Sequence, residues 1–282
     1  MDIFLKNKDE RAIATAIEDN FISFRLLFSR LPNARIFKDK GFLWIDSGTS
    51  RASWNGILKA KLHLEFFDDK IQLVLKYFQE VNRPFSCWLG YNNFSNAIQE
   101  RLTSHGFVQD EESAGMAADL TDCQVKIPYV SGLKIKKLSN PHEWESHVAV
   151  CVKSFNLDNI VEQFLSTIYR DVKSCIPYPF QHYLGYIDDE PVASSLLFFN
   201  SGIAGIYFIG TIPKFRGKGI GSALTAYSML RAKELGNRIA VLRASGMGEG
   251  IYRRLGFKDY FKFQLYLFKE LNKVKSKYFQ KE

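Results

Sequence analysis

The sequence predicts an α/β (α+β) protein of two domains, each built on a mixed sheet flanked by helices. Its 282 residues suffice for two domains, and 46% hydrophobic with 24% charged residues is typical of a globular protein. Apolar runs of strand length alternate with helical patterns along the chain. One long uncharged run, residues 191–213, is interrupted by the turn sequence Asn200-Ser201-Gly202. This run therefore predicts a hairpin of two buried strands and not a membrane span.

Residues 124–132 contain a proline and a glycine without a clear period, so they form the expected boundary between domains 1–125 and 126–282. Beyond it, Asn140 is expected to cap a helix with Pro141 in its first turn. The helices expected in this second half cover residues 142–155, 159–172 and 221–235. Its expected strands cover residues 133–138, 181–187, 192–199, 203–212, 239–242 and 261–268.

The first half shows the same mixture of patterns. Its expected helices cover residues 9–31 (as one or two helices), 68–81 and 96–104. Its expected strands cover residues 41–46, 56–62, 84–89 and 114–120.

The run from Arg216 to Gly221 (RGKGIG) lies between an expected strand, residues 204–212, and an expected helix. Glycine lets a backbone approach a ligand closely, and the first N–H groups of a helix have no intrahelical partner. Such a turn is suited to a pyrophosphate, and Lys214 and Lys218 add positive charge. The run matches neither the P-loop nor the dinucleotide fingerprint. It does match R-x-x-G-x-G.

A second motif follows about thirty residues later, at Tyr252-Arg253-Arg254-Leu255-Gly256-Phe257. The order is strand, R-x-x-G-x-G, helix, strand, short helix with Y-x-x-L-G-F, strand. With this order and spacing, residues 133–268 resemble the GNAT superfamily of acetyl-CoA-dependent N-acyltransferases. The resemblance implies a GNAT-like fold with a mixed, mostly antiparallel sheet.

The resemblance also implies roles for individual residues. The loop and the helix start would bind the pyrophosphate of acetyl-CoA, and the strand before the loop would bind the pantetheine arm and polarise the thioester carbonyl. Tyr252 would donate a proton to the departing thiolate, although it could instead be a core aromatic packed on Phe257. The implied acetyl-CoA contacts are Ile209, Gly210, Thr211, Arg216, Gly217, Lys218, Gly219, Ile220, Gly221 and Ser222.

No general base can be assigned from the sequence. Many relatives carry an acidic residue on the strand before the loop, but residues 204–212 contain none. Glu249 or His182 could act through water, or the amine could arrive neutral. Glu249 could equally be a solvated charge at a helix start, and His182 a strand residue bonded locally.

The first half also contains L-x-x-x-G-F, at residues 102–107, which is weakly similar to Leu255-Gly256-Phe257 and suggests an internal repeat. The chain thus resembles tandem GNAT proteins with a degenerate first half. The similarity could also be a coincidence, because helix-glycine-strand junctions are common. The first half lacks R-x-x-G-x-G, and no tyrosine precedes Leu102 as Tyr252 precedes Leu255. We therefore expect a structural role for it.

The net charge of +8 comes from dispersed residues and suits a polyanionic co-substrate better than a nucleic acid. The four cysteines (Cys87, Cys123, Cys151 and Cys175) form no C-x-x-C and have no histidine at metal-ligand spacing. We expect free thiols in a reducing cytosol, no metal, and no signal peptide in residues 1–20.

The leading interpretation is an N-acetyltransferase that transfers an acetyl group from acetyl-CoA to a primary amine by direct attack in a ternary complex. One alternative is a protein that binds acyl-CoA without turnover. Another is an aminoacyl-tRNA-dependent transferase of the Fem type, which the intact R-x-x-G-x-G disfavours. The acceptor amine stays open.

Overall fold

The computed structural model describes residues 9–30, 33–61, 64–121, 123–157, 162, 166, 180–200 and 202–272. These residues form two compact units, which we describe separately. The glycine-loop unit comprises Met1–Phe21 and Ala114–Tyr260, and the Phe85 unit comprises Ile22–Ser113 and Phe261–Glu282. Three elements contribute residues to both units: α2 (Glu10–Arg25), β5 (Phe107–Asp119) and β11 (Lys258–Phe268).

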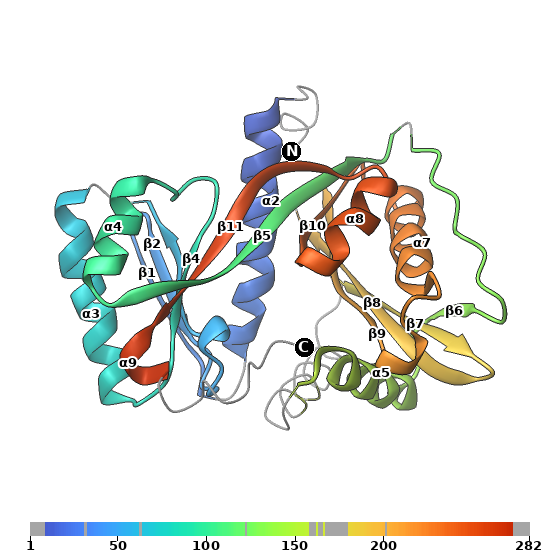
Figure 1. Cartoon of the computed structure of the whole chain (residues 1–282), viewed down its shortest axis with the longest axis horizontal. Helices are drawn as coiled ribbons and strands as arrows, with labels where there is room; N and C mark the ends of the chain where they lie inside the picture. Colours follow the sequence, from blue (N-terminus) through green and yellow to red (C-terminus); the bar gives the residue numbers. More distant parts are fainter. Residues whose placement is uncertain are drawn as a thin grey trace. The chain divides into compact units, whose positions relative to one another are not determined.

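The glycine-loop unit contains six neighbouring strands in the order β5-β10-β9-β8-β7-β6 (Figure 1). β9 and β10 are parallel, and the other neighbours in this series whose register is defined are antiparallel. Beyond β5, the strands are β6 (Lys134–Lys137), β7 (Phe180–Ile187), β8 (Glu190–Asn200), β9 (Ile203–Thr211) and β10 (Ile239–Ala244).

Two long helices, α5 (Pro141–Phe155) and α7 (Ile220–Glu234), pack against β8 and β9 (Figure 1). Successive side chains of a strand point to opposite faces. Ser194 of β8 bonds to a residue of α5, whereas Ser195 bonds to Ser228 of α7. The two helices therefore cover opposite faces of the hairpin β8–β9.

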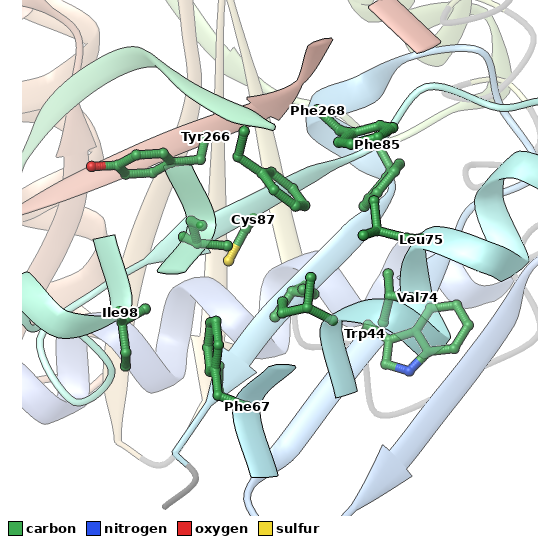
Figure 2. Packing of buried hydrophobic residues seen from close by; sticks show 14 of the residues in the cluster. Trp44, Phe67, Val74, Leu75, Phe85, Cys87, Ile98, Tyr266 and Phe268 are labelled. Atoms are coloured by element: carbon green, nitrogen blue, oxygen red, sulfur yellow. The ribbon is translucent and has the colours of Figure 1, made fainter. Parts of the chain in front are cut away.

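The Phe85 unit contains the strand order β1-β2-β3-β4-β11. Helices α3 (Phe67–Glu80) and α4 (Asn96–Ser104) accompany its strands β1 (Arg35–Asp39), β2 (Phe42–Asp46), β3 (Gly56–Ala60) and β4 (Ser86–Leu89). Aromatic rings fill its core, as Figure 2 shows. Phe85 stacks on Phe78 at 4.4 Å between ring centroids and lies 5.3 Å from Phe268 of β11.

The predicted fold class, a mixed and mostly antiparallel sheet flanked by helices, is confirmed. β1 was not predicted, and β5 begins seven residues before the expected start at Ala114. Both misses have one cause: RIFKD and FVQDEES carry charged side chains where a buried strand pattern was sought. The helix expected over residues 159–172 lies largely outside the described residues. The expected domain boundary at residue 125 stays a prediction.

Candidate functional site

The site begins where strands β9 and β10 separate. Their pairing covers three residues of each strand and ends at Gly205 and Val241. β10 continues to Ala244 beside β5, and β9 continues to Thr211 beside β8. In the described part of the chain, Gly210 and Thr211 thus have a strand partner on the β8 side alone, and the edge of residues 209–211 that faces away from β8 is open.

A β-bulge shapes β9 just before this open segment. The register between β8 and β9 shifts between Ser194 and Leu196, so two residues of β9 oppose Ser195. Phe208 in the bulge has a φ of +50°, which is rare for a bulky residue. The Ser194 hydroxyl donates a hydrogen bond of 2.9 Å to the Phe208 carbonyl oxygen. Sequence reasoning missed this feature because nothing in the residue types of β9 marks a bulge.

The glycine loop leads directly into α7. Gly219 is the N-cap residue with φ +81°, a left-handed conformation that favours glycine. The first turn of α7 contains no acidic residue, and Gly219 offers no side chain to cap it. The end of β9 lies beside this turn, because a Cβ built on Gly221 would be 3.8 Å from Thr211 Oγ1. The open edge of β9 and the helix N-terminus are therefore neighbours.

The basic residues of the loop have different surroundings. Arg216 donates to the carbonyl oxygens of Thr211 (3.1 Å) and Ser154 (2.7 Å), so it fastens the loop to β9 and α5. Lys214 forms an ion pair with Glu190, at 2.8 Å. The Lys218 ammonium is exposed and lies 5.1 Å from the centre of the Phe215 ring. Lys218 is thus the loop cation best suited to an incoming phosphate.

Gly210 packs directly against α5. A Cβ on Gly210 would lie 2.7 Å from Ser154 Cβ and 2.9 Å from the Phe155 ring. The family resemblance implies that the backbone of Gly210 contacts acetyl-CoA. In the structure, the end of α5 already fills the space where a side chain would stand.

Tyr252 lies on α8 (Gly246–Arg254), with its ring folded over Gly248. Burial raises the pKa of its phenol to about 12, and no hydrogen bond joins its hydroxyl to any of the described residues. Its ring also meets Phe257, at 6.0 Å between centroids. Ile209 and Tyr252 pack against one apolar cluster, which includes Leu242 of β10. The structure thereby brings these two predicted site residues to the same region.

Neither candidate base is shown to act as one. Glu249 lies in the first turn of α8 and forms an ion pair of 2.8 Å with Arg253. His182 is buried on β7, where its ring meets those of Trp144 (4.7 Å) and His147 (4.9 Å). Burial and the nearby His147 hold the pKa of His182 well below its usual range, so its imidazole is neutral.

A cavity of about 670 Å³ opens beside the first turn of α7. Of the predicted cofactor contacts, Ser222 alone lines it; Ile209–Thr211 and Tyr252 lie outside it. Its charged lining residues are Lys126, Arg254 and Asp119, so positive charge predominates, and Ile251 adds an apolar wall. Sequence reasoning assigned no role to Lys126 or Arg254, since Lys126 lies in the expected linker and Arg254 is a variable position of Y-x-x-L-G-F.

Within the described residues, no cluster of histidine, cysteine, aspartate or glutamate has an arrangement suited to a metal ion. Among the helices that the structure describes, none is long and apolar enough to cross a membrane. Cys87, Cys123 and Cys151 are free thiols.

Comparison with known families now adds to this geometry. Residues 179–259 match the family described as "Acetyltransferase (GNAT) domain". This segment contains the hairpin β8–β9, the glycine loop, α7, β10 and α8. Residues 179–259 therefore match a GNAT acetyltransferase domain, and the predicted resemblance to the GNAT superfamily is confirmed. A comparison with curated proteins gave no match.

Solved structures share the fold over both units. A GCN5-related N-acetyltransferase from Kribbella flavida aligns with a TM-score of 0.71 and 16% identity, covering 93% of this chain and 97% of that chain. A tandem GNAT protein from the clavulanic acid biosynthesis pathway aligns with a TM-score of 0.62 and 11% identity, covering 93% and 95%. A GCN5-related N-acetyltransferase from Sphaerobacter thermophilus aligns with a TM-score of 0.62 and 15% identity, covering 75% and 70%. At these identities the likeness shows the fold.

Proposed function

We propose that this protein transfers an acetyl group from acetyl-CoA to a primary amine by direct attack in a ternary complex. The observation that carries the proposal is the open edge of β9, which ends beside the uncapped N-terminus of α7. An extended arm with a pyrophosphate at one end fits this arrangement. Strand amides would bind the arm and helix amides would bind the anion.

The expected roles follow from this placement. The pyrophosphate would be held by the backbone amides of residues 217–222, with the Lys218 ammonium nearby. Backbone groups of Ile209, Gly210 and Thr211 would hold the pantetheine arm and polarise the thioester carbonyl. Arg216 acts indirectly, because its guanidinium positions the loop.

In the reaction, the amine nitrogen attacks the thioester carbon and the carbon–sulfur bond breaks. Tyr252 would give its phenolic proton to the departing thiolate. One observation supports this acid role: the Tyr252 ring packs against the same apolar cluster as Ile209. Burial raises the pKa of its phenol to about 12, so the phenol keeps its proton at neutral pH. A group that stays protonated at neutral pH is suited to donate a proton.

The cavity beside α7 supports coenzyme A as the carrier. Its volume lies within the usual range of small-molecule sites. Lys126 and Arg254 would meet the polyanionic end of the molecule, since they line the cavity together with Ser222. The position of this cavity also supports the proposed orientation of acetyl-CoA, with its nucleotide end near α7 and its acetyl end near Tyr252.

The Phe85 unit would have a structural role. Its core is filled by packed aromatic side chains, and its sequence contains neither motif of the acyl-CoA site. We propose that residues 1–125 form the degenerate half and residues 126–282 form the catalytic half. Three free thiols agree with a reducing compartment such as the cytosol.

The test is a screen of acetyl-CoA with a panel of primary amines, read by release of free thiol. We expect thiol release above the hydrolysis background with at least one amine, together with an acetylated product. Bound acetyl-CoA without turnover over a broad panel would favour acyl-CoA sensing. Binding of tRNA without binding of acetyl-CoA would favour the Fem-type reaction.

A further inference from the structure

A buried chain of hydrogen bonds connects α5 to the bulge of β9. The Cys151 thiol donates to Ser194 Oγ at 3.5 Å, and Ser194 Oγ donates to the Phe208 carbonyl at 2.9 Å. His147 Nδ1 lies 3.6 Å from Cys151 Sγ. Cys151, His147 and Ser194 are all fully buried. None of them belongs to the acyl-CoA site described above, so their arrangement calls for its own explanation.

The direction of these bonds is fixed by chemistry. A carbonyl oxygen only accepts, so the Ser194 hydroxyl must donate its proton to Phe208. A lone pair of Ser194 Oγ then remains for the Cys151 thiol. Burial raises the pKa of Cys151 to about 12, which keeps the thiol protonated as a donor. Ser194 is therefore unsuited to act as a nucleophile, since its hydroxyl is both buried and engaged.

The bond to Phe208 has a consequence for the next residue. The carbonyl of Phe208 and the N–H of Ile209 belong to one planar trans peptide unit, in which they point in opposite directions. Ser194 holds the carbonyl toward β8 and α5, and this turns the Ile209 N–H toward the opposite edge. That edge of β9 is open beyond Gly205. A peptide held with Phe208 at φ +50° needs such a restraint, because this conformation is strained for a residue other than glycine.

We infer that Ser194 is a positioning residue, which orients the Ile209 amide to donate a hydrogen bond to the thioester carbonyl oxygen of acetyl-CoA. This inference rests on the proposed function and names one donor among the three backbone positions of the site. The amide would stabilise the negative charge that develops on this oxygen when the amine attacks. Cys151 supports Ser194 from α5.

The neighbouring serine provides a matched control. Ser195 is also fully buried, and its hydroxyl bonds to Ser228 of α7 at 2.6 Å on the opposite face of the sheet. Ser194→Ala and Ser195→Ala each delete one buried hydroxyl from adjacent positions of β8. Both substitutions should lower the melting temperature to a similar extent, because each removes one buried hydrogen bond. Only Ser194→Ala should affect the Ile209 amide.

The experiment compares three readouts in the full-length chain. For Ser194→Ala we expect kcat to fall at least tenfold, while the dissociation constant of CoA, which lacks the acetyl carbonyl, changes less than about twofold. Infrared spectra of bound acetyl-CoA labelled with ¹³C at the carbonyl should show a higher stretching frequency than in the wild type. Ser195→Ala should match the wild type in all three readouts.

A second pair protects the test against misfolding. Thr and Val have the same shape and differ by one hydroxyl, so Ser194→Thr should keep the wild-type frequency and Ser194→Val should raise it. Equal kcat values and equal frequencies in Ser194→Ala and Ser195→Ala would overturn the inference. If the wild type binds acetyl-CoA without turnover, the proposed function fails and the carbonyl frequency still decides the role of Ser194. No binding of acetyl-CoA to the wild type would overturn both.

Discussion

At the scale of single residues, the site depends on where each polar group is held. Tyr252 has its hydroxyl in apolar surroundings, where burial raises its pKa to about 12. Ser194 and Arg216 act on backbone carbonyls and thereby fix the bulge and the loop. A phenol in such a place remains protonated at neutral pH.

Tyr252→Phe keeps the ring and its packing on Phe257 but removes the proton donor. We expect kcat to fall by about 10²-fold or more, and the dissociation constant of acetyl-CoA to stay within about twofold. Stopped-flow single turnovers should be used with steady-state rates, so that product release is separated from chemistry. Wild-type rates in single turnovers would assign Tyr252 to packing alone.

The buried histidines predict a dependence of stability on pH. Burial lowers the pKa of His147 from 6.5 to about 4, against a hydrogen bond to the Ser195 backbone that raises it. The unfolded chain therefore binds a proton first as the pH falls. The contribution of His147 to the free energy of unfolding is fully present above about pH 6.5. Roughly 3 kcal/mol of it is lost as the pH falls toward 4.

His147→Gln provides the comparison for this prediction, because glutamine is polar and does not titrate. Urea unfolding at several pH values from 7 to 4.5 should show a shallower loss of stability in the variant than in the wild type. The residual slope includes His182, whose pKa is also lowered by burial. Identical slopes in the two proteins would show that His147 does not contribute.

Residue-scale predictions from sequence were successful where a motif has a local cause. Asn140 was predicted as a helix cap with Pro141 in the first turn, and its side chain accepts a hydrogen bond from the Glu143 N–H. The packing of Gly210 against α5 was not predicted, because its neighbours Ser154 and Phe155 are over fifty residues away in sequence. Spacing along the chain carries no information about such contacts.

At the scale of elements, α8 shows how a helix can place the side chain of the proposed acid, Tyr252. The helix sequence GMGEGIYRR contains three glycines, which are unfavourable in a helix interior. A Cβ on Gly248 would lie 2.5 Å from the Tyr252 ring, whereas a Cβ on Gly250 would lie 3.5 Å from Arg254, an ordinary contact. Gly248 thus gives the Tyr252 ring its place, and Gly250 does not.

Gly248→Ala and Gly250→Ala make a matched pair. Each replaces one glycine in the same helix, and alanine should favour the helix by up to about 1 kcal/mol. Gly250→Ala should keep the wild-type kcat and melt slightly higher. Gly248→Ala should fold but displace the Tyr252 ring, with at least a tenfold decrease in kcat. Equal kcat values for the two variants would show that Gly248 has no role in placing the Tyr252 ring for the reaction.

Most elements followed from local signals. α4 begins after Ser95, whose side chain accepts from the Ile98 N–H, and its predicted bounds at residues 96–104 are confirmed. The separation of β9 from β10 could not be read from residue types, because it depends on which strands become neighbours.

At the scale of the whole molecule, each half of the sequence contributes a strand segment to the unit that the other half mainly forms. Residues Ala114–Asp119 of β5 pair with β10 in the glycine-loop unit. Residues Gln264–Leu267 of β11 pair with β4 in the Phe85 unit, where Tyr266 and Phe268 join the core. Each unit is completed by a strand segment from the other half of the sequence. Composition shifts predict linkers, but they cannot reveal such an exchange.

This exchange predicts how the chain responds to division. Residues 1–125 alone would lack β11, and residues 126–282 alone would lack β5, so neither fragment should fold cooperatively or bind acetyl-CoA. Co-expression should restore a soluble complex that binds acetyl-CoA. Circular dichroism melts and co-purification are the measurements. A cooperative melt and acetyl-CoA binding in isolated residues 126–282 would contradict this view.

The central claim is that one acetyl-CoA binds per chain, at the glycine loop of α7. Calorimetric titration of the intact chain tests it most directly, with Ser222→Glu and Ser222→Gln as a matched pair. Glutamate in the first turn suits the helix dipole but would repel a phosphate, whereas glutamine has the same size and no charge. We predict a stoichiometry of one for the wild type and for Ser222→Gln, and at least a tenfold weaker affinity for Ser222→Glu. A stoichiometry of two, or equal affinities in both variants, would contradict the claim.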